Sequence, residues 1–276
     1  MNDILFILGP EGAGQSYLPQ ALSKAGYHVL QDLSIEEMEE AFQSPFLGSA
    51  ATVVLHALDE RFIEFAKTKK KGGVGAFFVL LDAESSTRLL RISSHPLQAQ
   101  GYGLGEACAE DDFLLGKLRP YADMVLDTTR LEEDGVIKQV LSLLEHRGEM
   151  TVRFLSCGFR FGTPRDANLI LDCRNAPNPF WNLSLRDFCG LDEPIIAFME
   201  SHPETEEIYG PMRDYIDSFL VTRKKQGRRL VNIYLACTGG QHRSVYFASR
   251  LYKEFEKQYR CETYHRDQPL WRSYHA

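Results

Sequence analysis

The sequence predicts an α/β protein in which parallel strands alternate with helices in two domains. Short apolar, β-branched runs recur along the chain, and segments with helical spacing of apolar residues separate them. Strands separated by helices indicate parallel, helix-covered sheets. A chain of 276 residues is also long for a single core, so two domains are expected.

The composition is that of a soluble globular protein with unevenly placed charge. Apolar residues make up 44% and charged residues 25%, and no apolar run approaches the ~20 residues of a membrane span. Residues 1–150 hold 13 Lys and Arg against 23 Asp and Glu, whereas residues 151–276 hold 18 against 15. The contrast favours phosphate or polyanion chemistry in the second half, although ordinary surface charge explains it too.

The six cysteines lack C-x-x-C spacing, which indicates neither a zinc site nor a disulfide framework. The first residues lack the basic segment and cleavage site of a signal peptide. We therefore expect a protein of the reducing cytoplasm that does not associate with membranes.

The first domain, residues 1–148, is predicted to be a P-loop kinase-like sheet. Strands are expected at 4–8, 27–30, 52–58, 76–82 and 124–127, and helices at 17–25, 35–42, 61–71, 111–118 and 131–145. Residues 93–105 are rich in glycine and serine and are expected to form a lid. The domain boundary is expected at Arg147-Gly148-Glu149, where a glycine ends a helix and a new strand begins.

Gly9-Pro10-Glu11-Gly12-Ala13-Gly14-Gln15-Ser16 has the frame of a Walker A loop with glutamine in place of lysine. The missing hydrogen bond to a charged group is worth about 1.5–3 kcal/mol. We expect weak ATP or GTP binding with Mg²⁺ and little hydrolysis. The alternative is that the loop has only a structural role in the fold and binds no nucleotide. The nucleotide candidates are Gly9, Gly12, Gly14, Gln15, Ser16 and Asp82. Asp82 suits a water-mediated magnesium contact or, equally, the N-cap of the next helix.

The second domain, residues 149–276, is expected to contain strands at 150–155, 167–174, 230–236 and 261–265. Helices are expected after Asp192, which is the expected N-cap, and at 209–222 and 245–252. Between the third strand and the last helix lies Cys237-Thr238-Gly239-Gly240-Gln241-His242-Arg243-Ser244, called the 237–244 loop below.

The 237–244 loop is a candidate phosphate site. A strand–glycine turn–helix corner gathers free backbone N–H groups at the positive end of a helix dipole, which suits an anion. Gly239 and Gly240 allow conformations that a Cβ forbids, and Arg243 adds a forked cation. A tight turn without a ligand is the alternative, which the surrounding polar side chains make less favourable.

Neighbouring segments supply further candidates for the same crevice. Asp172 and Arg174 lie at the carboxyl end of a predicted strand, where ligands bind in open α/β sheets, although a mutual ion pair explains them equally well. The proline-fixed turn that contains Asn178 and Phe180 suits a pocket wall. His265 and Arg266 suit the anion site or RNA phosphates, with a surface pair as the simpler alternative.

Five motifs carry a family resemblance. They are Phe159-Arg160-Phe161-Gly162-x-Pro164-x-Asp166-Ala167, Leu171-Asp172-x-Arg174, Pro177-Asn178-Pro179-x-Trp181, Gly190-Leu191-Asp192-x-Pro194 and Cys237-Thr238-Gly239-Gly240-x-His242-Arg243-Ser244-Val245-Tyr246. With them the chain resembles the RapZ/YvcJ-type family of bacterial RNase adapters and nucleotide-binding proteins. The resemblance covers the whole chain and is most specific in residues 151–270.

The resemblance implies a regulatory adapter that requires no cofactor. Its C-terminal domain would bind glucosamine-6-phosphate through contacts that include Thr238, Gly239 and Arg243. It would also present small regulatory RNAs to ribonuclease E and so control glucosamine-6-phosphate synthase. The expected partners are a phosphorylated amino sugar, a small RNA, a ribonuclease or another regulatory protein, and further copies of the chain.

Several positions depart from the family pattern. Gln15 replaces the Walker lysine, Leu55-His56-Ala57-Leu58 replaces Asp-Val-Arg-Asn, and an arginine-rich lid is reduced to Ser93-Ser94-His95-Pro96-Leu97. These three losses predict impaired nucleotide hydrolysis. Phe180 stands where family members often carry a histidine in the sugar pocket, which argues against an identical sugar ligand. The tail from Asp267 lacks the lysine cluster of RNA-binding members, which argues against RNA contact by the tail.

An enzymatic alternative rests on Cys237 and Arg243, which have the C-x5-R spacing of cysteine phosphatases. A cysteine at a helix N-terminus beside cations is a good nucleophile. Asp172 and Asp192 are the candidate general acids, without positional support. Nucleotide hydrolysis at the 9–16 loop ranks last.

Overall fold

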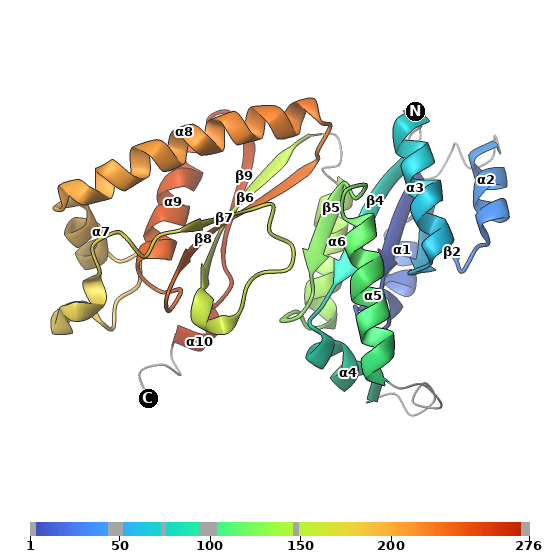
Figure 1. Ribbon diagram of the computed structural model, residues 1–276, viewed down its shortest axis with the longest axis horizontal. Helices are drawn as coiled ribbons and strands as arrows, with labels where there is room; N and C mark the ends of the chain where they lie inside the picture. The colour runs from blue at the N-terminus through green and yellow to red at the C-terminus, as the bar shows by residue number, and fades with distance from the viewer. Residues whose placement is uncertain (1–3, 44–51, 73–75, 94–103, 146–148, 272–276) are drawn as a thin grey trace. The chain divides into compact units, whose positions relative to one another are not determined.

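The computed structural model describes residues 4–43, 52–72, 76–93, 104–145 and 149–271, and it has the predicted α/β architecture. The chain divides into two compact units, Met1–His146 and Arg147–Ala276, and each unit contains its own parallel sheet (Figure 1). No helix in the described ranges is long and apolar enough to cross a membrane.

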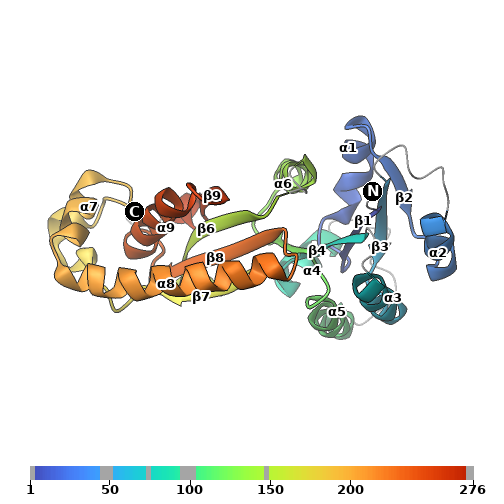
Figure 2. The ribbon, with the colours of Figure 1, turned by 90° about the horizontal axis from the view of Figure 1, so that it is seen from above.

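The first unit is built on a five-stranded parallel sheet of order β2-β3-β1-β4-β5. Its strands are β1 (Ile4–Gly9), β2 (His28–Gln31), β3 (Thr52–Ala57), β4 (Ala76–Asp82) and β5 (Met124–Asp127). Its helices are η1 (Gln15–Tyr17), α1 (Leu18–Lys24), α2 (Ile35–Gln43), α3 (Glu60–Gly72), α4 (Ser85–Ser93), α5 (Leu104–Leu118) and α6 (Glu133–Glu145). Figure 2 shows α1 and α6 on one face of this sheet and α3 and α5 on the other.

Helices on both faces explain why β1 is apolar and buried at every position. On the face that α3 covers, Phe6 stacks on Phe78 with ring centroids 5.1 Å apart, and Phe62 and Phe65 pack against Phe6. The predicted strands all form, with ends shifted by a residue or so. The 9–16 loop therefore begins at the carboxyl end of β1, at the edge of the sheet where the parallel strands end.

One helix begins earlier than its predicted start at residue 111. Helix α5 starts at Leu104, which lies within the predicted lid. The added segment contains Glu106, Ala107, Ala109 and Glu110, which are strong helix formers and outweigh Gly105. The rest of the predicted lid lies mainly outside the described residues.

The second unit contains a four-stranded parallel sheet of order β7-β8-β6-β9. Its strands are β6 (Thr151–Gly158), β7 (Leu169–Asp172), β8 (Leu230–Cys237) and β9 (Arg260–His265). Its helices are α7 (Glu193–Glu200), α8 (Pro203–Lys225), α9 (Arg243–Phe255) and α10 (Gln268–Trp271), with short turns η3 (Phe159–Phe161), η4 (Pro179–Trp181) and η5 (Leu183–Leu185).

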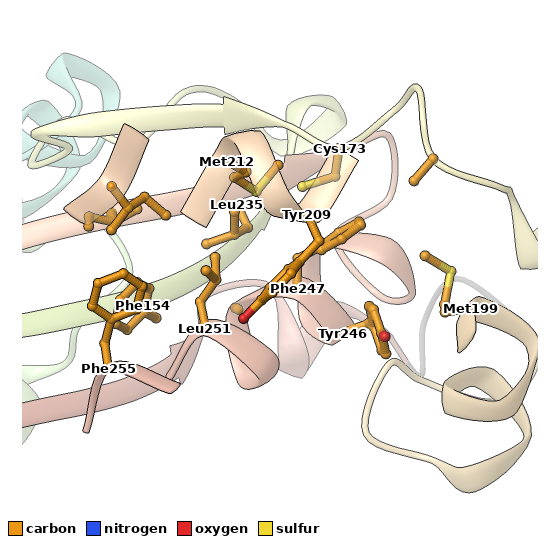
Figure 3. Packing of buried hydrophobic residues seen from close by; sticks show 14 of the residues in the cluster. Phe154, Cys173, Met199, Tyr209, Met212, Leu235, Tyr246, Phe247, Leu251 and Phe255 are labelled. Atoms are coloured by element: carbon orange, nitrogen blue, oxygen red, sulfur yellow. The ribbon is translucent and has the colours of Figure 1, made fainter. Parts of the chain in front are cut away.

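Helices α7, α8 and α9 share one core with one face of this sheet. Side chains alternate along β8, so that Val231, Ile233 and Leu235 join this core while Tyr234 and Ala236 join a smaller cluster on the opposite face. Figure 3 shows Phe154 of β6 beside Phe255 of α9, and their ring centroids are 5.5 Å apart. This packing fixes α9 against the strand that carries the 237–244 loop.

Several details of the second unit differ from expectation. Strand β7 spans only Leu169–Asp172 of the predicted 167–174, so Arg174 lies beyond its end. Helix α8 extends six residues before its predicted start at 209, and α10 was not predicted at all. Asp192 does occupy the N-cap of α7, but its carboxylate accepts the Cys189 amide at 2.6 Å and makes no capping bond to the helix.

Candidate functional site

The 237–244 loop forms the predicted strand–turn–helix corner. Strand β8 ends at Cys237, helix α9 begins at Arg243, and Gly240 adopts a left-handed φ of 73° between them. That conformation favours glycine because a Cβ is strained there. His242 is the N-cap residue of α9 and makes no side-chain capping bond.

The sulfur of Cys237 makes hydrogen bonds within the loop. The Gly240 amide donates to Cys237 Sγ at 3.2 Å, and the Ser244 hydroxyl lies 3.2 Å from the same atom. Cys237 and Ser244 are both buried. The loop therefore closes around its own cysteine, with the first turn of α9 as one wall.

Two glycines outside the loop let other segments contact it closely. A Cβ on Gly158 would lie 2.7 Å from the carbonyl carbon of Gly239, and a Cβ on Gly190 would lie 2.3 Å from the His242 oxygen. The Gly190 amide also donates to the Gln241 carbonyl at 2.8 Å. Gly158 and Gly190 were not predicted as site residues, although Gly190 opens one family motif and Gly158 directly precedes another, which was a usable signal.

The C-terminal segment after β9 supports the loop from another side. Asp267 is fully buried and accepts the Gly158 amide at 2.6 Å, and the Trp271 indole donates to the Gly240 carbonyl at 3.1 Å. Sequence reasoning missed both residues because these contacts join positions far apart in the chain.

Gln241 and His242 point toward the 186–190 segment. Gln241 Nε2 donates to the Phe188 carbonyl at 3.0 Å, and His242 Nε2 lies 3.2 Å from the Arg186 carbonyl. Both side chains are buried, so their placement favours support of the loop. A direct contact with a sugar phosphate stays a prediction for these two residues.

Thr238 and Gly239 form the accessible part of the loop. Thr238 is exposed, Gly239 is half-buried, and a Cβ on Gly239 meets no atom of the described chain within 4 Å beyond its sequence neighbours. The loop thus offers open space at one glycine while its neighbour Gly240 is tightly packed.

Arg243 is buried and links the loop to the segment after β7. Its Nη1 donates to the carbonyls of Arg174 at 2.7 Å and Ala176 at 3.2 Å. Within the described part of the chain, its Nε and Nη2 make no hydrogen bond. The arginine therefore has a structural role and keeps donors for an anion.

Asp172 and Arg174 form the ion pair that the sequence left as one of two alternatives. Arg174 donates to both carboxylate oxygens of Asp172 at 2.6–3.0 Å, and its hydrogen bonds hold the pKa of that carboxyl below its usual value. Asp172 also lies opposite Ala236 in the β7–β8 register, which places it beside the 237–244 loop. The geometry is therefore compatible with both interpretations of Asp172, as a partner of Arg174 and as a residue of the ligand crevice.

The Asn178 turn reaches the loop through Arg186. Asn178 Oδ1 accepts the Phe180 amide at 3.3 Å, and the Arg186 guanidinium lies over the Phe180 ring at 4.8 Å. Arg186 in turn places its carbonyl beside His242. The predicted pocket wall is thus connected to the loop by one residue.

His265 and Arg266 have internal partners. His265 is buried, its Nδ1 lies 2.9 Å from the Ser156 hydroxyl, and burial lowers the pKa of its imidazole. The Arg266 guanidinium donates to Asp267 and to the carbonyls of Gly158 and Gly162. These contacts favour a structural role, and RNA contact at the two positions stays a prediction.

The 9–16 loop of the first unit also has the predicted shape. Gly12 and Gly14 adopt φ of 78° and 101°, and a Cβ on Gly12 would lie 2.8 Å from the Arg88 carbonyl oxygen. A cavity of about 170 Å³ opens beside the loop, lined by Glu11, Gly12, Gly14, Gln15, Ser16, Tyr17, Arg91 and Ile92.

Two arginines occupy the surroundings of this loop. Arg91 donates to the carbonyls of Gly12 at 3.0 Å and Thr128 at 2.7 Å. Asp82 is fully buried and forms an ion pair with Arg119, so a magnesium ion would have to compete with that guanidinium. The magnesium contact expected for Asp82 stays a prediction, whereas the N-cap role is wrong, because Asp82 is the last residue of β4 and α4 begins only at Ser85.

Comparisons with known proteins match both units. A family model described as the RapZ-like N-terminal domain matches residues 2–147, and one described as the RapZ C-terminal domain matches residues 150–269. A nucleotide-binding protein of Haemophilus influenzae is 31% identical over 92% of this chain and 93% of its own length. An RNase adapter protein RapZ of Yersinia pseudotuberculosis is 29% identical over 90% of this chain and 91% of its own length.

Among solved structures, a shikimate kinase from Acinetobacter baumannii aligns with 52% of this chain and 93% of its own, at 15% identity and a TM-score of 0.36. The sequence matches, which run through both units, settle the relationship: the chain belongs to the RapZ-like family of RNase adapters and nucleotide-binding proteins.

Proposed function

We propose that this protein is a regulatory adapter whose 237–244 loop senses a phosphorylated amino sugar such as glucosamine-6-phosphate. Binding of the sugar phosphate would control association with a ribonuclease, a small RNA or another regulatory partner. Membership of a family that includes named RNase adapters supports the adapter role.

One observation carries the ligand assignment. The loop combines exposed Thr238, open space at Gly239 and two Arg243 donors that make no hydrogen bond within the described residues. Backbone amides at the start of a 13-residue helix and a guanidinium together suit a phosphate dianion.

Asp172 supports the amino-sugar part of the proposal. Its carboxylate is partly exposed, lies beside the loop and carries a negative charge at neutral pH, since the ordinary pKa of an aspartate lies well below 7 and the hydrogen bonds from Arg174 lower it further. A sugar ammonium would compete with Arg174 for this carboxylate, which distinguishes an amino sugar from a neutral one.

The test is calorimetric titration of the full chain with glucosamine-6-phosphate, glucose-6-phosphate and inorganic phosphate. We expect the amino sugar phosphate to bind most tightly. Gly239→Ala should weaken its binding at least tenfold, since the methyl group fills the open space, corresponding to about 1.4 kcal/mol. Gly210→Ala on α8, where a Cβ also meets no neighbour within 4 Å, is the matched control and should bind normally.

Equal affinity for the two sugar phosphates would refute the amino-sugar assignment, and unchanged binding in Gly239→Ala would refute the location. The adapter role is tested by measuring association with a candidate ribonuclease in the presence and absence of the bound ligand. A ligand that does not alter this association would contradict control by the loop.

A second candidate function is a cysteine-dependent phosphatase. It is favoured by the hydrogen bonds of Cys237 Sγ with Gly240 and Ser244, which hold the sulfur at the first turn of α9 in a C-x5-R loop. Turnover of para-nitrophenyl phosphate that disappears in Cys237→Ser would establish it. Absence of turnover in the folded, ligand-binding chain would leave the loop as a sensor.

A further inference from the structure

Two cysteines occupy paired positions at the ends of neighbouring strands. In the β7–β8 register Asp172 lies opposite Ala236, so the next residues along the two strands are Cys173 and Cys237. The Cys173 amide donates to the Ala236 carbonyl at 2.7 Å, which is the ladder bond that sets Cys173 opposite Cys237.

Both side chains project to the helix-covered side of the sheet. Leu171 and Cys173 of β7 belong to the core that Leu235 of β8 joins, and Cys237 lies two residues beyond Leu235, so alternation gives it the same direction. Figure 3 shows Cys173 in this core near Leu235. The two thiols also interact electrostatically, which adds to the effect of burial in raising the pKa of Cys173.

The spacing suits a covalent bond between them. Neighbouring strands lie about 4.8 Å apart, and disulfides join residues whose Cα atoms are about 4.4–6.8 Å apart. In the structure both thiols are free. A bond between Cys173 and Cys237 would therefore need side-chain rotation and little movement of the backbone.

We propose that Cys173 and Cys237 form a reversible redox site in which a peroxide converts the two thiols to a disulfide at the base of the 237–244 loop. The Cys237 thiol loses its proton and its sulfur attacks one oxygen of hydrogen peroxide, which forms a sulfenic acid and releases hydroxide, and the hydroxide takes up that proton as water. The Cys173 sulfur then attacks the Cys237 sulfur, and the sulfenic oxygen leaves as water with the Cys173 proton. One peroxide is reduced to two waters overall, and a thiol reductant reverses the step.

The environments of the two sulfurs assign their roles. Cys237 lies in the loop next to the accessible residues Thr238 and Gly239, and the Gly240 amide donates to its sulfur at 3.2 Å, which suits the sulfur that meets the peroxide. Cys173 is fully buried, its thiol donates to the Leu171 carbonyl at 3.7 Å, and burial raises its pKa, which suits the resolving position. Cys157 of β6 lies near Cys237 in register but belongs to the cluster on the opposite face, so it is not expected to compete.

Disulfide formation would change the loop. The Cys237 sulfur would turn toward β7 and lose its contacts with Gly240 and Ser244, which hold the accessible residues Thr238 and Gly239 in place. We expect the oxidised chain to lose sugar-phosphate binding. This consequence rests on the proposed function, whereas the disulfide itself does not.

The test uses the folded full chain treated with hydrogen peroxide, alkylated at its remaining thiols, digested without reductant and mapped by mass spectrometry. We expect a linked peptide pair that contains Cys173 and Cys237 and that disappears on reduction. The pair should persist in Cys157→Ser. It should be absent in both Cys173→Ser and Cys173→Ala, in which a sulfenic-acid probe should label Cys237 instead.

Peroxide-treated wild-type chain without this linkage, or with Cys237 linked to another cysteine, would overturn the redox site, and this result requires no variant to fold. Calorimetry with glucosamine-6-phosphate then tests the consequence. Binding should be lost on oxidation and regained on reduction, and full binding by the disulfide form would overturn control of the loop. If the reduced chain fails to bind the ligand, the proposed function fails while the peptide map still decides the redox site.

Discussion

The two glycine loops of this protein share a backbone device and differ in what surrounds it. Each follows a buried parallel strand and contains a left-handed glycine pressed against a neighbouring backbone, Gly12 against Arg88 and Gly240 against Gly158. At the 9–16 loop, glutamine stands at the lysine position and the acidic Asp82 is paired with Arg119. At the 237–244 loop, Arg243 and the exposed Thr238 accompany the glycines.

The difference shows that the glycines that set a loop's backbone conformation can be present without the charged side chains that would bind a phosphate. Both loops keep the glycines that the backbone shape requires. The charged side chain that would stabilise a phosphate is replaced by Gln15 in the 9–16 loop and is present as Arg243 in the 237–244 loop. Four substitutions test this comparison, and they are described from the largest expected effect to the smallest.

The largest effect is expected for Gly240→Ala. Its φ of 73° strains a Cβ, which would also lie 2.6 Å from the Gly158 nitrogen, so we expect a loss of about 3 kcal/mol or more in unfolding free energy. Urea unfolding followed by circular dichroism measures it. Gly239→Ala, which meets open space, is the control and should unfold at the wild-type midpoint. Equal midpoints for the two variants would contradict the tight packing of the loop.

Gln15→Lys tests how much of the nucleotide site remains. The added ammonium should strengthen ATP binding about tenfold or more, since a charged hydrogen bond contributes about 1.5–3 kcal/mol. Hydrolysis should stay at background because Asp82 is held by Arg119. Fluorescent-nucleotide titration and phosphate release are the measurements, with Gln15→Leu as the uncharged control. Restored turnover would show that the ion pair does not block the site.

His265 should make the second unit sensitive to acid. Burial lowers the pKa of His265 in the folded state, so below about pH 6.5 the unfolded chain binds more protons and stability falls. Each pH unit below that value costs up to about 1.4 kcal/mol, until the folded imidazole itself protonates. The difference in urea midpoints between pH 7.5 and pH 5.5 should shrink in His265→Asn. An identical pH dependence in the variant would refute this assignment.

The smallest effect is expected for Asp172→Asn. The lowered pKa of Asp172 means that the ion pair stabilises the fold above about pH 4, and this contribution is lost as the pH falls. Because both side chains are substantially exposed, the urea midpoint at pH 7 should hardly change. Binding of the amino sugar phosphate should nevertheless weaken, which calorimetry measures. A large fall in stability would show that the pair is structural.

The sequence predicted most elements because apolar patterns and glycine turns are local signals. Strand 76–82 and strand 124–127 form as predicted, and the 237–244 corner is present with its helix. The contacts that fix this corner are not local: Asp267 and Trp271 reach it from the end of the chain, and Gly190 from the segment before α7. The spacing of apolar residues along the chain does not predict hydrogen bonds between residues that are far apart in sequence.

The site residues likewise divide into features that local sequence signals predict and features that long-range contacts determine. The pairing of Asp172 with Arg174 was one of two open readings because residues two apart at a strand end can contact each other or a ligand. The orientation of Gln241 and His242 depends on the carbonyls of Phe188 and Arg186, which only the folded chain brings near. Residue type thus indicated the chemistry of the loop, and tertiary packing determined which donors face outward.

The position of β6 has a consequence for synthesis of the protein. This first strand of the second unit lies between β8 and β9, the last two strands, and pairs with both in parallel. Its neighbours therefore emerge from the ribosome long after it does, and pairings this distant in sequence form slowly. The unit cannot complete its sheet, or bring the Asp267 carboxylate to the Gly158 amide, until residues 260–267 have been made. A nascent chain that stalls before β9 would expose an unpaired edge of β6 and should be a substrate for chaperones.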